Sequence, residues 1–166
     1  EISSSVNQAY DNKFDTEEIV PLHKIEDAYL MELYHGPTSA FKDIALTLLP
    51  HLLIQSYNKE NRHDTISILT ATSGDTGKAA LAGFADVPGT RIVVFYPKGV
   101  VSPIQEKQMV TQKGDNTYVV GITGNFDDAQ TAVKKMFNDR ELSAELNEAG
   151  FQFSSANSIN IGRLVP

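Results

Sequence analysis

The sequence contains no cysteine among its 166 residues. That absence excludes disulfide bonds and thiolate metal sites, and it is typical of proteins that work in a reducing compartment. Long apolar runs are missing as well, because no stretch reaches the roughly 18 residues that a membrane-spanning helix requires. We therefore expect a cytoplasmic protein without a membrane segment.

Basic charge is scarce, since 14 Lys and Arg residues stand against 21 Asp and Glu residues, which gives a net charge of -7. A surface of that sign repels nucleic acids and anionic membranes unless basic side chains gather on one face. Here the basic residues are scattered along the chain. The four histidines show no spacing that converges with carboxylates as metal ligands do. The sequence thus predicts no nucleic-acid partner, no membrane partner and no metal.

The composition is otherwise that of a globular protein, with 41% hydrophobic and 21% charged residues. A chain of this length can form one good core or two small ones. It begins without Met and ends on Arg163-Leu-Val-Pro166 with no closing element. We interpret it as a fragment.

Apolar runs and helical patterns alternate over residues 64–155. Strands are expected at 65–71, 91–96, 116–120 and 151–155, and helices at 77–84, 103–112, 127–138 and on to 147. Strands joined by helical crossovers form a parallel sheet that is covered on both faces. The predicted fold class is α/β, built from βαβ units.

The first third of the chain has a different pattern. Residues 22–34 alternate enough to hold one or two short strands with a turn near Glu26-Asp27. The first strong helix is expected to begin near Ser39, where Thr38 or Ser39 can cap it. Pro50 is expected to kink this helix or to end its first half.

Lys42 stands near the start of that helix, at the head of an apolar stripe formed by Ala45, Leu46, Leu49 and Leu53. Burial and the positive end of a helix both disfavour an ammonium, so the neutral amine that forms an imine becomes accessible. The ordinary alternative is a lysine whose amine reaches water past the stripe. On this feature alone the alternative is the more common case.

A glycine loop, Ser73-Gly-Asp-Thr-Gly77, follows the first parallel strand and opens a helix. Its N–H groups and hydroxyls converge on the positive end of the helix, which predicts a bound carboxylate or phosphate. A nucleotide P-loop is excluded because only two residues separate Gly74 from Gly77-Lys78. The dinucleotide fingerprint fails because its third glycine is missing. A tight turn without a ligand remains the alternative.

Taken together, two segments resemble the cofactor-lysine and substrate-loop motifs of the threonine synthase family, namely His35-Gly-Pro-Thr-Ser-Ala-Phe-Lys-Asp43 and Thr72-Ser-Gly-Asp-Thr-Gly-Lys-Ala-Ala80. The likeness continues through Tyr96-Pro-Lys-Gly99, Ser102-Pro-Ile-Gln105 and Ser155-Ala-Asn-Ser-Ile-Asn-Ile-Gly-Arg163, so it covers essentially the whole chain. The resemblance implies the two-domain fold of the tryptophan-synthase-β-like pyridoxal-phosphate enzymes. In that fold residues 1–63 would be part of the larger domain, which carries the lysine. Residues 64–150 would form a smaller parallel α/β domain, and residues 151–166 would return toward the larger one.

The resemblance also implies pyridoxal 5'-phosphate as the cofactor, with its ring as the electron sink. The reaction would convert O-phosphohomoserine and water to L-threonine and phosphate, by γ-elimination of phosphate and addition of water at the β-carbon. Lys42 would be the imine partner and the proton shuttle. Asp75 would lie beside the ring hydroxyl of the cofactor.

Other matching positions would bind the substrate. Its carboxylate would be held by Ser73, Gly74 and Thr76. Its phosphate would be held by Asn157, Ser158 and Arg163, since a guanidinium binds a dianion with two parallel hydrogen bonds. Thr38 and Ser39 could also reach a phosphate, although helix capping explains them equally well.

The departure from the family is an absence. No loop for the cofactor phosphate and no partner for its ring nitrogen occur before Pro166. The segment Gly124-Asn-Phe-Asp-Asp128 has a similar sequence to such a loop but stands too early, and we interpret it as a helix cap. This piece alone is expected to bind the cofactor poorly and not to turn over.

Two other functions stay open. One is a different enzyme of the same fold, such as a threonine or serine dehydratase or a cysteine synthase, which needs no phosphate contact. The other is a non-catalytic relative that binds an amino-acid phosphate or a partner protein. The presence of Lys42 together with the complete glycine loop argues against a silent scaffold. The oligomeric state is left open.

Overall fold

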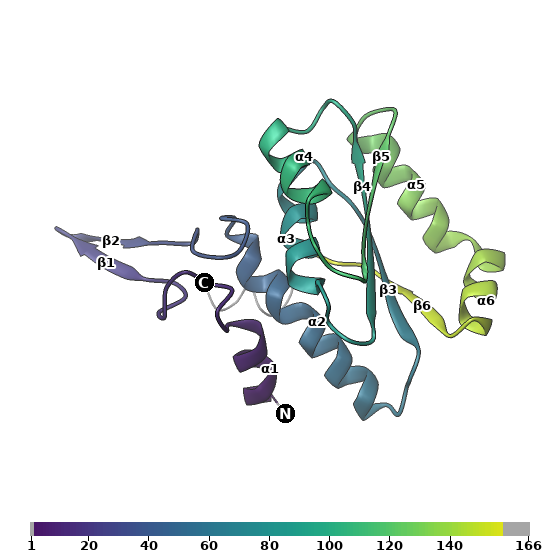
Figure 1. The fold of residues 1–166 in the computed structure, drawn as a ribbon, viewed down its shortest axis with the longest axis horizontal. Coiled ribbons are helices and arrows are strands. Elements are labelled where there is room, and N and C mark those ends of the chain that lie inside the picture. The colour runs from purple at the N-terminus through teal and green to yellow at the C-terminus, as the bar shows by residue number, and fades with distance from the viewer. Residues whose placement is uncertain (1, 158–166) are drawn as a thin grey trace.

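A parallel four-stranded sheet forms the centre of the computed structural model, which describes residues 2–157 (Figure 1). The strand order is β5-β4-β3-β6 and every neighbouring pair is parallel. The strands are β3 (Thr65–Ala71), β4 (Thr90–Pro97), β5 (Thr117–Ile122) and β6 (Phe151–Ser154). Strand β3 lies inside the sheet and is an almost continuous buried run, as parallel strands covered on both faces are. The predicted α/β fold with a parallel sheet is confirmed.

Helices cover the sheet on two sides (Figure 1). On one side α3 (Asp75–Phe84) packs on the sheet, and α2 (Lys42–Lys59) and α4 (Pro103–Val110) pack on α3. On the other side lie α5 (Phe126–Asn138) and α6 (Arg140–Glu148). Helix α5 begins with a capping box, in which Asn125 and Asp128 exchange side-chain to backbone hydrogen bonds of 2.8 and 3.0 Å. The interpretation of this segment as a cap is therefore confirmed.

The core lies between the sheet and α3. Its fully buried side chains come from alternate positions of β3 and β4 and from one face of α3, among them Ile66, Ile68, Ile92, Val94, Leu81 and Phe84. Helix α2 adds Leu46, and α4 adds Met109. The core thus fixes α2, α3 and α4 relative to one another and to the sheet.

The start of α2 differs from the prediction. The residue before the helix is Phe41, and no side chain caps it. Thr38 lies four residues before the first helical residue, and its hydroxyl donates to Asp43 Oδ1 at 2.6 Å instead of accepting from a backbone N–H of the helix. The helix also continues through Pro50 to Lys59, so of the two expected effects of Pro50 the ending of the helix does not occur. Pro50 cannot bond the carbonyl of Leu46 four residues earlier, and this carbonyl is the group that lies against Gly83 of α3.

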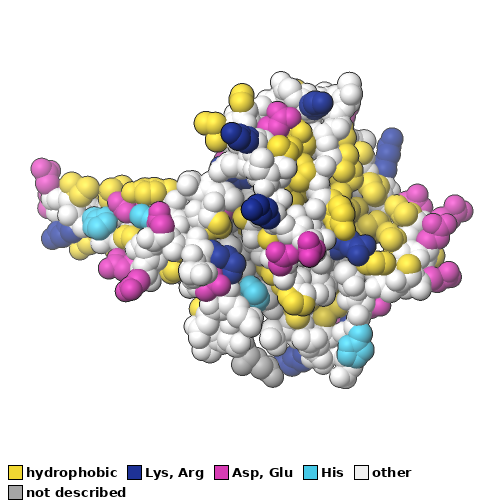
Figure 2. All heavy atoms as spheres, in the orientation of Figure 1, with side chains coloured by type: hydrophobic (Ala, Val, Ile, Leu, Met, Phe, Trp, Pro, Cys, Tyr) yellow, Lys and Arg dark blue, Asp and Glu magenta, His cyan; other side chains and the backbone are white. Residues whose placement is uncertain are grey.

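The chain before α2 forms an arm and a short helix. Helix α1 (Ile2–Ala9), which the polar sequence did not predict, packs against α2. Strands β1 (Leu22–Ile25) and β2 (Ala28–Met31) pair as an antiparallel hairpin, as expected from the alternation at 22–34. The hairpin projects away from the sheet (Figure 1) and carries exposed apolar side chains (Figure 2).

The division of the chain into domains stays a prediction. Strand β6 pairs with β3 from Thr65↔Phe151 to Ile68↔Ser154, so residues 151–154 belong to the sheet of the smaller unit.

Within residues 2–157 no helix is both long and apolar enough to cross a membrane.

Candidate functional site

Lys42 is the first residue of α2, and its ammonium points to the glycine loop rather than along the apolar stripe of its own helix. Its Nζ donates a hydrogen bond of 2.9 Å to Thr76 Oγ1 in the first turn of α3. The contact is partly buried and joins residues 34 positions apart. The two motifs that the sequence singled out therefore meet at the starts of α2 and α3.

The glycine loop is held by Thr72, the buried residue that follows β3. Its Oγ1 accepts hydrogen bonds from the backbone N–H groups of Gly74 and Gly77, at 2.9 and 2.8 Å. Gly74 adopts φ 140°, a conformation that favours glycine, and a Cβ there would collide with the side-chain amide of Gln105. Ser73 lies exposed at the tip. The loop is thus fixed by the hydroxyl of Thr72, which precedes it, and by the side chain of Gln105 from α4.

The carboxylate of Asp75 is held by two neighbouring side chains. Its Oδ1 accepts from Gln105 Nε2 at 2.8 Å and forms an ion pair with Lys78 Nζ at 3.3 Å. Lys78 is only 9% exposed, and its ammonium also donates to the Thr38 carbonyl at 3.1 Å. Sequence reasoning gave no role to Gln105 or Lys78. Charge-assisted hydrogen bonds of this kind fix the orientation of a carboxylate.

A second carboxylate, Asp43, fastens the segment that leads into Lys42. It is 0% exposed, and its oxygens accept from the backbone N–H and hydroxyl of Thr38, at 2.8 and 2.6 Å, and from the N–H of Ala40 at 3.4 Å. Burial raises the pKa of this carboxyl, while the hydrogen bonds and the charge of Lys78 act in the opposite direction. Sequence reasoning placed Asp43 in the family's lysine motif but gave it no role in fixing this segment.

Thr38 and Ser39 have different surroundings. Thr38 is buried, and both its hydroxyl and its backbone N–H are bonded to Asp43. Ser39 is exposed and has φ 56°, which is uncommon for a residue other than glycine. Thr38 therefore shapes the backbone before Lys42, whereas the side chain of Ser39 faces solvent.

A pocket of about 380 Å³ opens at the carboxyl end of β3. Crevices at this end of parallel strands are the usual ligand sites of open α/β sheets. The pocket brings together Thr76 of the glycine loop and Asn157, which follows β6, and α5 contributes Gln130 and Lys134 to its wall. Two other predicted phosphate ligands, Ser158 and Arg163, lie outside the described residues.

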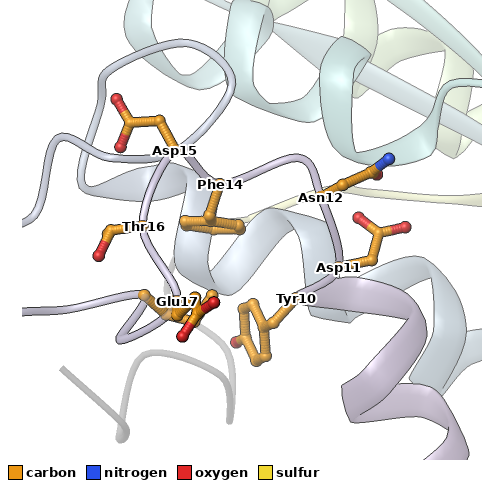
Figure 3. Close-up of a pocket in the computed structure, with 8 residues that line it drawn as sticks. Tyr10, Asp11, Asn12, Phe14, Asp15, Thr16 and Glu17 are labelled. Atoms are coloured by element: carbon orange, nitrogen blue, oxygen red, sulfur yellow. The ribbon is translucent and has the colours of Figure 1, made fainter.

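Another hollow, shown in Figure 3, lies far from these residues in the sequence. It is formed by one stretch of chain that winds around the ring of Phe14, and it is lined by Asp11, Asp15 and Glu17 among others. It contains none of the predicted site residues. Within residues 2–157 no group of three or more His, Cys, Asp or Glu side chains could hold a metal ion.

Known proteins with similar sequences and structures agree on one family. Residues 15–160 match the family described as pyridoxal-phosphate-dependent enzymes. Threonine synthase of Buchnera aphidicola subsp. Baizongia pistaciae is 40% identical over 165 residues, which cover 99% of this chain and 36% of the relative. Human threonine synthase-like 1 is 38% identical over 172 residues, which cover 99% of this chain and 23% of the relative.

The solved structure of pyridoxal-phosphate-bound threonine synthase from Brucella melitensis superimposes with a TM-score of 0.85 at 38% identity. The match covers 99% of this chain and 34% of that one. The chain thus spans about a third or less of the length of these relatives.

Proposed function

Since this chain belongs to the family of pyridoxal-phosphate-dependent enzymes, we propose that it is the lysine-bearing part of a threonine synthase. The whole protein would convert O-phosphohomoserine and water to L-threonine and phosphate. The observation that carries the proposal is the hydrogen bond between Lys42 and Thr76, which brings the two motifs of the family into one site. Relatives named threonine synthase support it across 99% of the chain.

The described residues fit the family's cofactor on chemical grounds. A partly buried primary amine, which can bond to an aldehyde, faces hydroxyl and N–H donors at the positive end of α3. The neighbouring Asp75 is already fixed by Gln105 and Lys78. When bound, pyridoxal phosphate supplies an electron sink for charge that develops at the substrate's α-carbon.

Lys42 has two tasks in this proposal. It holds the cofactor through its amine, and it moves protons at the substrate's α-carbon when the amine is free. Thr76 orients the amine through its hydroxyl, and Asp43 fixes the backbone from which Lys42 projects. Holding the amine near the α-carbon lowers the entropic cost of bringing the two groups together. This saving is a large part of the rate enhancement of enzymes.

The substrate would be held at both ends. We assign its carboxylate to Ser73, Gly74 and Thr76, at the start of α3, and its phosphate to Asn157 together with Ser158 and Arg163. We assign Ser39 as a further phosphate contact, because it is exposed beside Lys42. For Thr38 we favour a positioning role, since its hydroxyl is bonded to Asp43.

The domain assignment is proposed with one change. Residues 1–63 would belong with the larger domain and residues 64–150 would form the smaller one. The pairing of β6 with β3 extends the smaller unit to residue 154. The rest of the segment to residue 166 would then lead back to the larger domain.

The direct test is borohydride reduction of the whole protein with pyridoxal phosphate, followed by peptide mass mapping. Modification is expected at Lys42 alone. In the Lys42→Ala variant the trapping should disappear and turnover should fall by about a thousandfold or more. Lys59→Ala, at the other end of the same helix, is the matched control and should behave as the wild type.

The substrate is tested separately. Phosphate release from O-phosphohomoserine is expected, without comparable deamination of serine or threonine and without sulfide-dependent replacement on O-acetylserine. Rapid deamination or replacement without phosphate release would move the assignment to the dehydratases or cysteine synthases. A folded protein in which borohydride leaves Lys42 unmodified contradicts the proposal altogether.

A further inference from the structure

The pocket at the carboxyl end of β3 has an unusual balance of charge for an acidic protein. Among its described lining residues there is one charged side chain, Lys134, and no carboxylate. Over the whole sequence acidic residues outnumber basic ones by 21 to 14. The remaining polar groups of the lining are hydroxyls and amides, namely Thr70, Thr76, Ser155, Gln130 and Asn157. All of them can donate hydrogen bonds to an anion.

Lys134 belongs to the wall of the pocket through the geometry of α5. The helix lines the pocket with Gln130, Val133, Lys134 and Phe137, which recur at the spacing of one helix face. The Nζ of Lys134 donates to Gln130 Oε1 at 3.1 Å, one turn back on that face. A neutral amide orients the ammonium without compensating its charge. The next residue, Lys135, does not line the pocket.

The pocket adjoins the reactive amine through Thr76. This residue lines the pocket, and its hydroxyl accepts the hydrogen bond from Lys42 Nζ at 2.9 Å. Asn157 approaches from the segment after β6. A ligand bound to the Lys42 site therefore has this pocket as its neighbouring space.

We propose that Lys134 is a specificity-determining residue that binds the phosphate ester of the substrate in this pocket. A phosphate ester carries close to two negative charges at neutral pH, and a lysine ammonium binds it as a point charge. Hydroxyl and amide donors around the ammonium suit the several oxygens of a tetrahedral anion. The identity of the substrate rests on the proposed function, whereas the preference for a phosphate group does not.

The test uses the whole protein loaded with pyridoxal phosphate and inorganic phosphate as the probe. Binding is measured by titration calorimetry at constant ionic strength, with acetate as the comparison anion. Lys134→Ala should weaken phosphate binding about tenfold or more, because a charge-assisted contact is lost. Lys134→Arg should stay within about threefold of the wild type, and acetate should not compete.

Lys135→Ala is the matched control, since it removes the same charge from the adjacent position outside the pocket. It should leave phosphate affinity unchanged. Equal weakening in both alanine variants would show that only long-range charge matters and would overturn the proposal. An unchanged affinity in Lys134→Ala, or a wild type that binds no phosphate, would overturn it as well.

Kinetics with O-phosphohomoserine separate this inference from the proposed function. Lys134→Ala should raise KM about tenfold while borohydride trapping at Lys42 persists, which shows that the site still folds. If the wild type releases no phosphate but binds it through Lys134, the reaction assignment fails and the pocket assignment stands. If turnover proceeds with the same KM in Lys134→Ala, the pocket assignment fails and the reaction stands.

Discussion

Asp43 shows how one buried side chain can determine the conformation of a site without entering the chemistry. It receives hydrogen bonds from the backbone N–H groups of Thr38 and Ala40 and from the Thr38 hydroxyl. Buried N–H groups that lose their acceptor are expensive to leave unpaired. The carboxylate therefore fixes the turn from which Lys42 emerges.

Replacing Asp43 separates this structural task from its charge. Asp43→Ala should lower the free energy of unfolding by about 3 kcal/mol, because buried N–H donors lose their acceptor. Asp43→Asn should cost clearly less, since the amide oxygen can accept from the N–H groups while Thr38 Oγ1 accepts from the amide. Urea denaturation of the two variants measures the difference. Equal losses would contradict this account of the turn.

Asp43 also links stability to pH. Burial raises its pKa in the folded state above that of the unfolded chain, so the folded state binds more protons in the window between the two values. Stability should then fall as pH rises through this window, which begins just above the ordinary pKa of an aspartate. In Asp43→Asn this part of the pH dependence should be absent.

His35 joins the root of the hairpin to the segment before it. Its ring nitrogens lie 2.5 Å from Asp15 Oδ1 and 2.7 Å from Glu32 Oε2. These hydrogen bonds, first to Glu32 and then to Asp15, raise the pKa of the imidazole. The stabilisation is fully present below the ordinary histidine pKa and is lost as pH rises through the raised value.

An NMR titration of the His35 ring protons tests this arrangement. The wild-type pKa of His35 should lie above the ordinary histidine value. Glu32→Gln should lower this pKa, because the hydrogen bond to Glu32, which raises the pKa most, then no longer involves a charged acceptor. Glu26→Gln, at the far turn of the hairpin, serves as the control. A His35 pKa that does not respond to Glu32→Gln would rule out the contact.

At the scale of elements, the crossing of α2 and α3 depends on one glycine and one proline. Gly83 has no side chain where the Leu46 carbonyl approaches, and a Cβ there would collide with this backbone group. Pro50 leaves the same carbonyl without its helical partner. The two helices thus come together where α3 lacks a side chain and where α2 has a carbonyl that Pro50 cannot hydrogen-bond.

Gly83→Ala reverses the usual effect of such a change. Alanine in a helix interior normally stabilises by about 0.5–1 kcal/mol relative to glycine, but here the overpacked crossing should destabilise by about 1–3 kcal/mol. The urea midpoint of the variant measures the sign. A rise in the midpoint would mean that α2 and α3 do not touch at this point.

The predictability of these elements follows from where their stabilising partners lie in the sequence. Strand β3 is predictable because Thr65–Ala71 is a short run of apolar and small hydroxyl-bearing residues that ends at a glycine-containing turn. The start of α2 is not, because Thr38 bonds the side chain of Asp43 and does not cap the backbone of the helix. Helix α1 is polar, and it is anchored by distant contacts such as Tyr10 Oη donating to the Ile44 carbonyl at 2.7 Å.

For the candidate site, too, the sequence predicts the local motifs but not the contacts between residues that are far apart in the chain. Lys42 and the glycine loop belong to local motifs, and their meeting at Thr76 follows once both motifs are placed in one fold. Lys78 pairs with the nearby Asp75, but its hydrogen bond to the Thr38 carbonyl spans 40 residues, and the bond from Gln105 to Asp75 spans 30. No local pattern marks such contacts. The roles proposed for the site residues stay predictions until they are tested.

At the scale of the whole molecule, the candidate site lies at the end of the sheet where strand β3 finishes and helices α2 and α3 begin. The starts of α2 and α3 and the carboxyl end of β3 meet at one end of the sheet, while the opposite ends of these elements carry none of the predicted residues (Figure 1). A parallel sheet gathers the loops after its strands at a single edge. Packing in the core therefore fixes the spacing of side chains that approach from distant parts of the chain.

The position of β6 has a consequence for how the chain is made. β3 is built from residues 65–71, yet its partner on one side, β6, begins only at Phe151. While the ribosome makes the residues between, that edge of β3 presents unpaired N–H and C=O groups on an apolar strand. Nascent chains are prone to wrong pairing at such edges. A pause in translation before Phe151 would thus prolong the period in which a neighbouring nascent chain, or a chaperone, can take the place of β6.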